Sequence, residues 1–168
     1  MKLAKVFKEN KQFTLFSILA LVVVGVAVFA PQIAPYDPLD AVMLESLQAP
    51  SSAHPFGTDK LGRDLLSRVI FGTRTSLVMT LCLVAVIFVI GTFLGIIAGY
   101  FGGIVDGVIM RIADMMISFP GLVLAIAIAG MLGPNLVNAV ISIAAVSWTK
   151  YARLARSMVL RVKKESLY

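Results

Sequence analysis

Residues 75–105 read TSLVMTLCLVAVIFVIGTFLGIIAGYFGGIV and contain no charged side chain. About 20 apolar residues of helix cross the hydrocarbon core of a bilayer, so this stretch is long enough to span a membrane. Two further uncharged stretches, residues 12–36 and 115–149, lie on either side of it. Only 14% of all residues are charged, against about 25% in a typical soluble domain. The sequence therefore predicts a membrane protein.

The third uncharged stretch is long enough for two spans, and Gly133-Pro134-Asn135 interrupts it. Proline lacks a backbone donor and clashes with the preceding helical turn, so a hairpin is expected there. We predict an all-α, polytopic fold with about four transmembrane helices, at residues 13–34, 75–100, 115–132 and 136–152. A signal peptide is the alternative for the first span, but its apolar run exceeds the usual core of about 7–15 residues.

Basic residues flank the outermost spans. They are Lys2, Lys5, Lys8 and Lys11 before the first span, and Lys150, Arg153, Arg156, Arg161, Lys163 and Lys164 at and beyond the end of the last. The positive-inside rule then places both termini in the cytoplasm. This topology accounts for the basic charge, so no nucleic-acid partner is expected.

The predicted organisation follows from the spans and the charges. Residues 1–12 form a cytoplasmic N-terminal segment, 13–34 the first transmembrane helix, 35–74 an external loop, 75–152 a transmembrane core of three spans, and 153–168 a cytoplasmic amphipathic helix. In this last helix the apolar residues recur at helical spacing and most basic residues lie off that stripe. It is interpreted either as an anchor on membrane lipid or as a lead toward a cytoplasmic partner.

Glycines recur every four residues in and after the second span, at Gly91, Gly95, Gly99, Gly103 and Gly107. This period predicts one ridge along a helix, where a second helix can approach closely. The ridge can be interpreted either as a simple packing contact or as a face that moves against a neighbouring helix during transport, and the sequence leaves both interpretations open. Near the cytoplasmic interface, Arg111 and Asp114 are spaced to pair along one helix.

No pattern indicates catalysis, a metal site or a cofactor in this chain. HExxH, CxxC and GxSxG are all absent, His54 is the sole histidine, and Cys82 is the sole cysteine. Residues 57–62 have the glycine spacing of a P-loop, but Arg63-Asp64 follows where Lys-Ser/Thr is needed. The chain is therefore expected to be neither an enzyme nor a nucleotide-binding protein.

The segment HPFGTDKLGRD at residues 54–64 resembles the external segment of permeases in the dipeptide/oligopeptide/nickel ABC importer family. The resembling residues are His54, Pro55, Phe56, Gly57, Thr58, Asp59, Leu61, Gly62, Arg63 and Asp64. The resemblance continues, in family order, through AGYFGG (98–103), MRIAD (110–114), SFP (118–120), LGP (132–134) and YAR (151–153). On these residues the chain is similar to a C-type permease subunit. The resemblance implies the type I permease fold of the family, of which this chain would form a part.

The resemblance implies a multi-pass protein of the bacterial inner membrane. It also implies transport of peptides or nickel by alternating access, with a weak lean toward nickel from residues 148–153. The implied partners are a second related permease, two cytoplasmic ATPase subunits that bind ATP and Mg²⁺, and an extracytoplasmic solute-binding protein. It also implies a cytoplasmic coupling region that includes Tyr151, Arg153, Arg156, Arg161 and Glu165. The family's Glu-Ala-Ala docking loop is expected to begin just after Tyr168. The alternative functions are a non-transporting structural or assembly subunit, or an inactive truncated permease.

Overall fold

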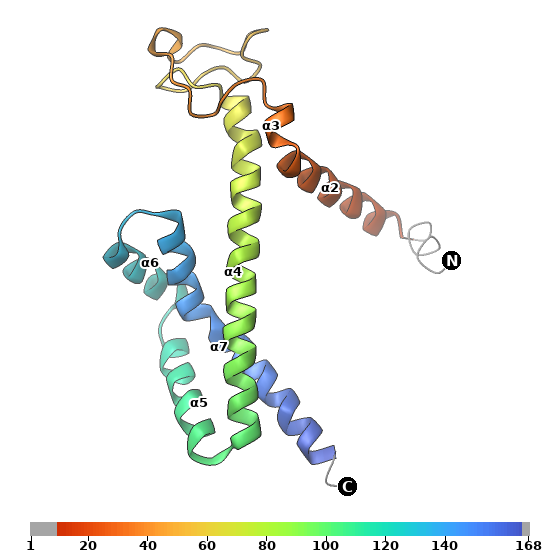
Figure 1. The fold of residues 1–168 in the computed structure, drawn as a ribbon, viewed down its shortest axis with the longest axis vertical. Coiled ribbons are helices and arrows are strands. Elements are labelled where there is room, and N and C mark those ends of the chain that lie inside the picture. Colours follow the sequence, from red (N-terminus) through yellow and green to blue (C-terminus); the bar gives the residue numbers. More distant parts are fainter. Residues whose placement is uncertain (1–9, 166–168) are drawn as a thin grey trace. The chain divides into compact units, whose positions relative to one another are not determined.

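The computed structural model describes residues 10–165, and this part of the chain is helical without a single strand (Figure 1). The elements are α2 (Lys11–Val28), α3 (Ala30–Ile33), the 3₁₀ helix η1 (Met43–Glu45), α4 (Leu65–Phe101), α5 (Gly103–Ser118), α6 (Gly121–Leu132) and α7 (Leu136–Glu165). The expected all-α fold is confirmed. The chain divides into two compact units, residues 1–78 and 79–168, and α4 begins in the first and continues into the second.

The first apolar stretch is divided into two helices, where the sequence predicted one helix over 13–34. Helix α2 ends at Val28, and Phe29 leaves the helical conformation with φ −91° and ψ 12°. Pro31 lies in the first turn of α3, a position where its missing N–H costs nothing. The chain therefore bends between α2 and α3 because Pro31 cannot continue the hydrogen bonding of α2.

Helix α4 begins at Leu65, before the predicted span of 75–100. The carboxylate of Asp64 accepts a hydrogen bond of 2.7 Å from the backbone N–H of Ser67 and so caps the helix. Residues 65–74 contain Arg68 and Arg74, which disfavour burial in a bilayer but do not disfavour a helix. The predicted start at residue 75 rested on where the charges end, whereas the Asp64 cap determines where the helix itself begins.

The third predicted span, 115–132, is broken in the structure. Helix α5 ends at Ser118, α6 begins at Gly121, and the two helices are bent by 93°. Phe119 is extended, with φ −90° and ψ 147°, because the ring of the following Pro120 excludes the helical conformation at the residue before it. The SFP triplet is thus a helix break, and the prediction of one continuous helix across it was wrong.

Helix α7 joins the fourth predicted span, 136–152, to the amphipathic segment predicted over 153–168, in one helix that ends at Glu165. Residues 1–9 and 166–168 of the predicted terminal segments lie outside the described residues. By length and composition, α2 and α4 are the two described helices able to cross a membrane, and the bent α5–α6 pair makes a third if it is one span. The expected count of four spans is therefore approximate.

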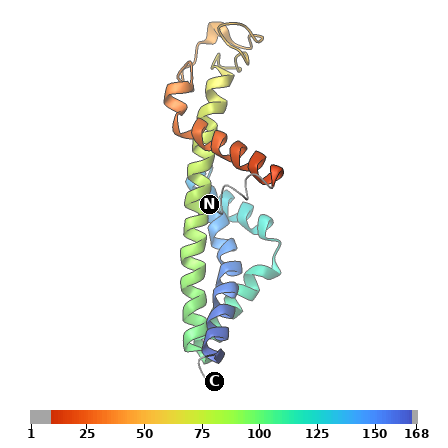
Figure 2. The same ribbon diagram turned by 90° about the vertical axis from the view of Figure 1, so that its right-hand side faces the viewer.

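Within the second unit, small residues are buried where the helices meet. Figures 1 and 2 show α7 beside the C-terminal half of α4, with α5 and α6 following α4 in the chain. The buried apolar residues of α4–α7 in this unit are Ile87, Ala98, Ala113, Ala125, Ala144 and Ala152. Five of these six side chains are single methyl groups, so the helix axes approach closely and the large side chains face outward.

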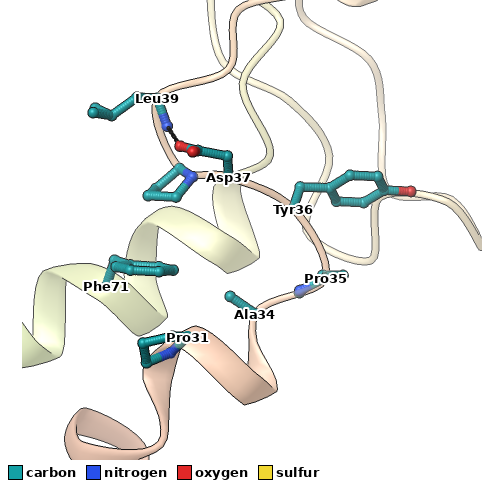
Figure 3. Close-up of a pocket in the computed structure, with 8 residues that line it drawn as sticks. Pro31, Ala34, Pro35, Tyr36, Asp37, Leu39 and Phe71 are labelled. Atoms are coloured by element: carbon teal, nitrogen blue, oxygen red, sulfur yellow. Dashed lines mark hydrogen bonds between the residues drawn. The ribbon is translucent and has the colours of Figure 1, made fainter.

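Within the first unit, the chain leaving α3 forms a hollow of about 560 Å³ with the start of α4. Figure 3 shows Pro31 and Phe71 on one side of it and the turn through Asp37 on the other. The carboxylate of Asp37 accepts a hydrogen bond of 2.8 Å from the backbone N–H of Leu39, which shapes this turn. The turn leads into the α3–α4 loop, residues 34–64.

Candidate functional site

Helices α4 and α7 approach each other most closely at three glycines, Gly91, Gly95 and Gly99, which we name the α4–α7 crossing. A Cβ atom added to Gly91 would lie 2.6 Å from the carbonyl oxygen of Trp148. At Gly95 the added atom would lie 2.3 Å from the carbonyl oxygen of Ala152, and at Gly99 it would lie 2.8 Å from Cβ of Val159. No real Cβ atom fits at such distances, so the backbones meet here because the side chains are absent.

Gly103 and Gly107 do not extend this contact, which differs from the predicted ridge of five glycines. Gly102 and Gly103 have positive φ values, 65° and 53°, which end α4 and turn the chain into α5. A Cβ atom added to Gly103 or to Gly107 would meet nothing within 4 Å. The four-residue period continues in the sequence, but the helix that carried it has ended.

Two ion pairs join α5 to α7. Asp106 receives hydrogen bonds from Nε and Nη2 of Arg156, each 2.5 Å long. Farther along α5, Asp114 pairs with Arg153 of α7. The predicted pairing of Asp114 with Arg111 is therefore replaced by a contact between helices, which spacing along one helix could not indicate.

A hollow of about 370 Å³ lies between the α5–α6 bend and α7. Phe119, Leu122 and Val146 give it an apolar wall, and Ser147 and Lys150 add polar groups. The break before Pro120 creates this space, because α6 turns away from the direction of α5 instead of continuing along it. The hollow is thus a consequence of the SFP triplet.

The segment HPFGTDKLGRD forms a hairpin, residues 57–65, that leads into α4. The backbone N–H of Asp59 donates to the carbonyl of Arg63 at 3.0 Å, and that of Leu65 donates to the carbonyl of Gly57 at 3.1 Å. The carboxylate of Asp59 closes the turn by accepting from the backbone N–H groups of Leu61 and Arg63 at 2.8 and 3.1 Å. It also pairs with the side chains of Arg63 and Arg68.

Two glycines of the hairpin cannot carry a side chain. Gly57 and Gly62 have φ values of 74° and 73°, which favour glycine. A Cβ atom at Gly62 would lie 1.8 Å from the carbonyl oxygen of Val42, and one at Gly57 would lie 2.4 Å from that of Gln48. The P-loop-like spacing of these glycines therefore serves the close approach of the backbone of residues 42–48.

His54 lies before the hairpin and is 6% exposed. Its Nδ1 is 2.9 Å from Oδ1 of Asp64, and its Nε2 is 3.3 Å from Oε2 of Glu45. The hydrogen bond with Asp64 is the main cause that raises the pKa of His54 above its ordinary value; burial opposes the rise, and Glu45 adds to it. The ring also packs against Tyr36, with centroids 4.9 Å apart.

The two acidic groups of this segment have lowered pKa values. Burial alone would raise the pKa of Asp64, but hydrogen bonds from the side chain and backbone of Ser67, together with His54, outweigh it. Burial likewise opposes ionisation of Asp59, and the hydrogen bonds from Arg63 and from the backbone of Leu61 outweigh it and lower the pKa. Both carboxylates are therefore ionised at neutral pH.

Two parts of the chain match described protein families. Residues 2–50 match the N-terminal TM domain of oligopeptide transport permease C, and residues 91–168 match the binding-protein-dependent transport system inner membrane component. The chain belongs to the family of inner-membrane permeases of binding-protein-dependent transport systems. The resemblance seen in the sequence is confirmed, and the protein is a membrane protein of the inner membrane, built from the apolar helices described above.

Curated permeases of several transport systems are similar to the chain. A probable D,D-dipeptide transport system permease protein of Escherichia coli (strain K12) is 40% identical over 163 residues, which are 97% of this chain and 55% of the relative. A glutathione transport system permease protein of Pectobacterium atrosepticum is 41% identical over 145 residues, 86% of this chain and 48% of the relative. A nickel transport system permease protein of E. coli K12 is 39% identical over 130 residues, 77% and 47% of the two chains.

The chain spans about half the length of the curated relatives it matches. Both the α4–α7 crossing and the two ion pairs fall within residues 91–168, the part that matches the transport component. The hairpin lies between the two matched segments. The structural features singled out above are therefore features of a permease chain, and they occur in both of its compact units.

The residues predicted for the coupling region lie on α7 and have different surroundings. The ring of Tyr151 packs edge-on against Phe88 of α4 with centroids 6.1 Å apart, while Arg153 and Arg156 bind the acids of α5. Arg161 and Glu165 are exposed near the end of the helix. Three of the five thus face neighbouring helices of the same chain.

Sequence reasoning missed the cluster around His54, which brings Tyr36 and Glu45 to Asp64 and Ser67. No spacing connects these residues, because four separate segments contribute them; the available signal was a lone histidine inside a specific motif.

In the described part of the chain, no three His, Cys, Asp or Glu residues are grouped so that they could hold a metal ion.

Proposed function

We propose that the chain is the permease subunit, or part of it, of an ATP-driven importer that moves peptides or nickel across the cytoplasmic membrane. The observation that carries the proposal is the membership in the permease family, with relatives named for dipeptide, glutathione and nickel transport. The α4–α7 crossing and the apolar hollow beside the α5–α6 bend support it, because close helix contacts and a break in a helix provide surfaces that can rearrange. The chain contributes the wall of a pathway and no bond-making chemistry.

The proposed partners are a second related permease, two cytoplasmic ATPase subunits and an extracytoplasmic solute-binding protein. The description of the matched family as binding-protein-dependent supports the last of these. ATP and Mg²⁺ would bind to the ATPase subunits, since residues 57–64 of this chain are engaged in the hairpin and its contacts. Membrane lipid would surround the exposed apolar faces of α2 and α4.

We propose that both termini are cytoplasmic and that the α3–α4 loop lies outside. The excess of lysine and arginine at both ends supports this orientation. Reporter fusions after residues 50 and 165 test it: a periplasmic reporter is expected to be active at 50 and a cytoplasmic reporter at 165. The opposite pattern would reject the orientation.

The exposed end of α7, with Arg161 and Glu165, is proposed to lead toward the ATPase. The pairs of Arg153 with Asp114 and of Arg156 with Asp106 support this role, because a force on the end of α7 would be transmitted to α5. Crosslinking of a cysteine at residue 161 or 165 to the ATPase, with a cysteine at residue 50 as the control, tests the contact.

Transport is tested in cells that lack their own peptide and nickel importers. The chain is expressed in its genomic context with the neighbouring transport genes, and uptake of radiolabelled dipeptide, glutathione and ⁶³Ni is measured. Uptake of one of the three, abolished when the Walker lysine of the ATPase is replaced, is expected. No uptake of any of them, with all subunits present in the membrane, would contradict the proposed function.

A further inference from the structure

Three segments of the first unit meet at the ring of His54, which a fourth segment carries. Tyr36 follows α3, Glu45 ends η1, and Asp64 caps α4. The hydroxyl of Ser67 donates to Asp64 at 2.7 Å and accepts a hydrogen bond of 3.1 Å from the backbone N–H of Tyr36. The single histidine of the chain is therefore the central connection of the α3–α4 loop.

The partners of His54 define its protonation state. A neutral imidazole has one N–H and one acceptor nitrogen, whereas an ionised carboxylate only accepts hydrogen bonds. Carboxylate oxygens lie 2.9 Å from Nδ1 and 3.3 Å from Nε2. The contact with Asp64 is a hydrogen bond, and the contact with Glu45 has the distance of an ion pair. The two are favourable together only when both ring nitrogens carry a proton, so the geometry fits an imidazolium.

We propose that His54 is a proton-dependent clamp of the α3–α4 loop: as an imidazolium it joins Glu45 to Asp64, and on losing its proton it keeps Asp64 and releases Glu45. This inference goes beyond the proposed transport function and does not depend on the substrate. It predicts that η1 is held at low pH and loosened at high pH, while the start of α4 stays in place.

The two arms of the clamp differ in strength, which decides where the last proton remains. The side chain of Asp64 is 1% exposed and lies at the shorter distance, whereas the side chain of Glu45 is 42% exposed. Water can replace His54 as the partner of Glu45 but cannot easily reach Asp64. The neutral ring is therefore the tautomer with its proton on Nδ1.

Release of Glu45 acts on a small part of the loop. Met43 and Leu44 of η1 are 68% and 96% exposed, so no buried apolar contact holds this turn. Its remaining connections to the hairpin include the contact of the Thr58 hydroxyl with the carbonyl of Glu45. They also include hydrogen bonds of 2.9 Å from the Ser46 hydroxyl to the carbonyl of Lys60 and of 3.0 Å from the N–H of Leu47 to the carbonyl of Asp59. The opening is thus confined to residues 42–46.

The direction of the pH effect follows from the raised pKa of His54. A group whose pKa is higher in the folded state contributes its full stabilisation below its ordinary value, 6.5, and loses it as the pH rises through the folded pKa. The groups that face the ring are Glu45, Asp64 and Tyr36. Among these side chains, histidine is the one whose ordinary pKa, 6.5, lies near neutrality.

Nitrogen-15 NMR of the ring tests the clamp in the full chain, purified in nanodiscs with a tag that contains no histidine. Because the chain has one histidine, the two ring signals need no assignment to a residue. We expect both nitrogens to be protonated at pH 6.5, and a neutral ring at higher pH with the proton on Nδ1. A ring already neutral at pH 6.5, or a proton retained on Nε2, would overturn the proposal.

Hydrogen exchange of residues 42–46 gives a second measurement. After correction for the intrinsic rate, exchange is expected to rise with pH, by about tenfold for each unit by which the clamp raises the pKa. Glu45→Gln should lower the pKa of His54 and flatten this pH dependence, because a glutamine amide can donate as well as accept. Asp40→Asn, at an exposed acid of the same loop, is the matched control and should behave as the wild type.

An unchanged titration and unchanged exchange in a folded Glu45→Gln chain would contradict the clamp. If the Glu45→Gln variant does not fold, two measurements on the wild-type chain still test the clamp. They are the tautomer of the neutral His54 ring and the pH dependence of hydrogen exchange at residues 42–46. Exchange of residues 42–46 that does not vary between pH 6 and pH 9 in the wild type would also reject the proposal.

Discussion

Arg156 on α7 donates two hydrogen bonds to the carboxylate of Asp106 on α5, from Nε to Oδ1 and from Nη2 to Oδ2, each 2.5 Å long. The residues are 50 positions apart in the chain. A bidentate contact of this kind fixes both the distance and the orientation of the two helices. The second pair, Asp114 with Arg153, is more exposed: the Asp114 side chain is 60% exposed and that of Asp106 17%.

The two pairs should therefore differ in their contribution to stability. Asp106→Asn removes the charge from a partly buried bidentate contact, and we expect it to lower the free energy of unfolding by about 1.5–3 kcal/mol. Asp114→Asn should cost less than about 1 kcal/mol, since water screens an exposed pair. Thermal unfolding of both variants in the same detergent checks this order, and equal losses would contradict it.

A second prediction concerns the α4–α7 crossing. In Gly95→Ala the new methyl group would lie 2.3 Å from the carbonyl oxygen of Ala152, so the helices must separate, at a cost of about 1–3 kcal/mol. Gly107→Ala, where nothing lies within 4 Å, should instead stabilise α5 by about 0.5–1 kcal/mol. Melting temperatures of the two variants should move in opposite directions; a loss of stability in Gly107→Ala equal to that in Gly95→Ala would rule out the crossing as the cause.

A third prediction concerns the hairpin. Gly62→Ala places a methyl group 1.8 Å from the carbonyl oxygen of Val42 at a backbone φ of 73°, and neither the contact nor the conformation suits alanine. We expect rapid proteolysis of residues 34–64 in this variant. Gly130→Ala in α6, with open space around it, should be cleaved as slowly as the wild type. Resistance of Gly62→Ala to the protease would show that the loop does not need this close approach.

A fourth prediction concerns the stability of the hairpin at low pH, and it follows from the lowered pKa of Asp59. Its contribution is fully present above the ordinary value, 3.8, and is lost as the pH falls through the lower folded pKa. After correction for the intrinsic rate, hydrogen exchange of residues 57–65 should therefore stay slow down to about pH 4 and become faster below it. In Asp59→Asn exchange should already be faster at pH 7, because Arg63 and Arg68 lose their partner. Slow, unaltered exchange of this variant would refute the assignment.

The sequence by itself determined the class of the fold. Long uncharged stretches such as 75–105 require a membrane, because charges are costly in hydrocarbon, and the HPFGTDKLGRD segment indicated the permease family. The breaks were less well predicted. Pro120 follows Phe119 in the middle of an apolar run, and hydropathy, which is summed over a window, does not register a single residue that excludes helical backbone.

Only the tertiary structure decided which residues meet. The four-residue period of glycines extends from 91 to 107, yet the contact with α7 ends at Gly99, because the positive φ values of Gly102 and Gly103 turn the chain away. Asp114 has Arg111 close by in the sequence but binds Arg153. His54 has no acidic neighbour at a recognisable spacing and nevertheless contacts Glu45 and Asp64. Local patterns fix what one helix or turn can do, whereas contacts between segments depend on where the chain bends, and those bends are set by single prolines, glycines and caps.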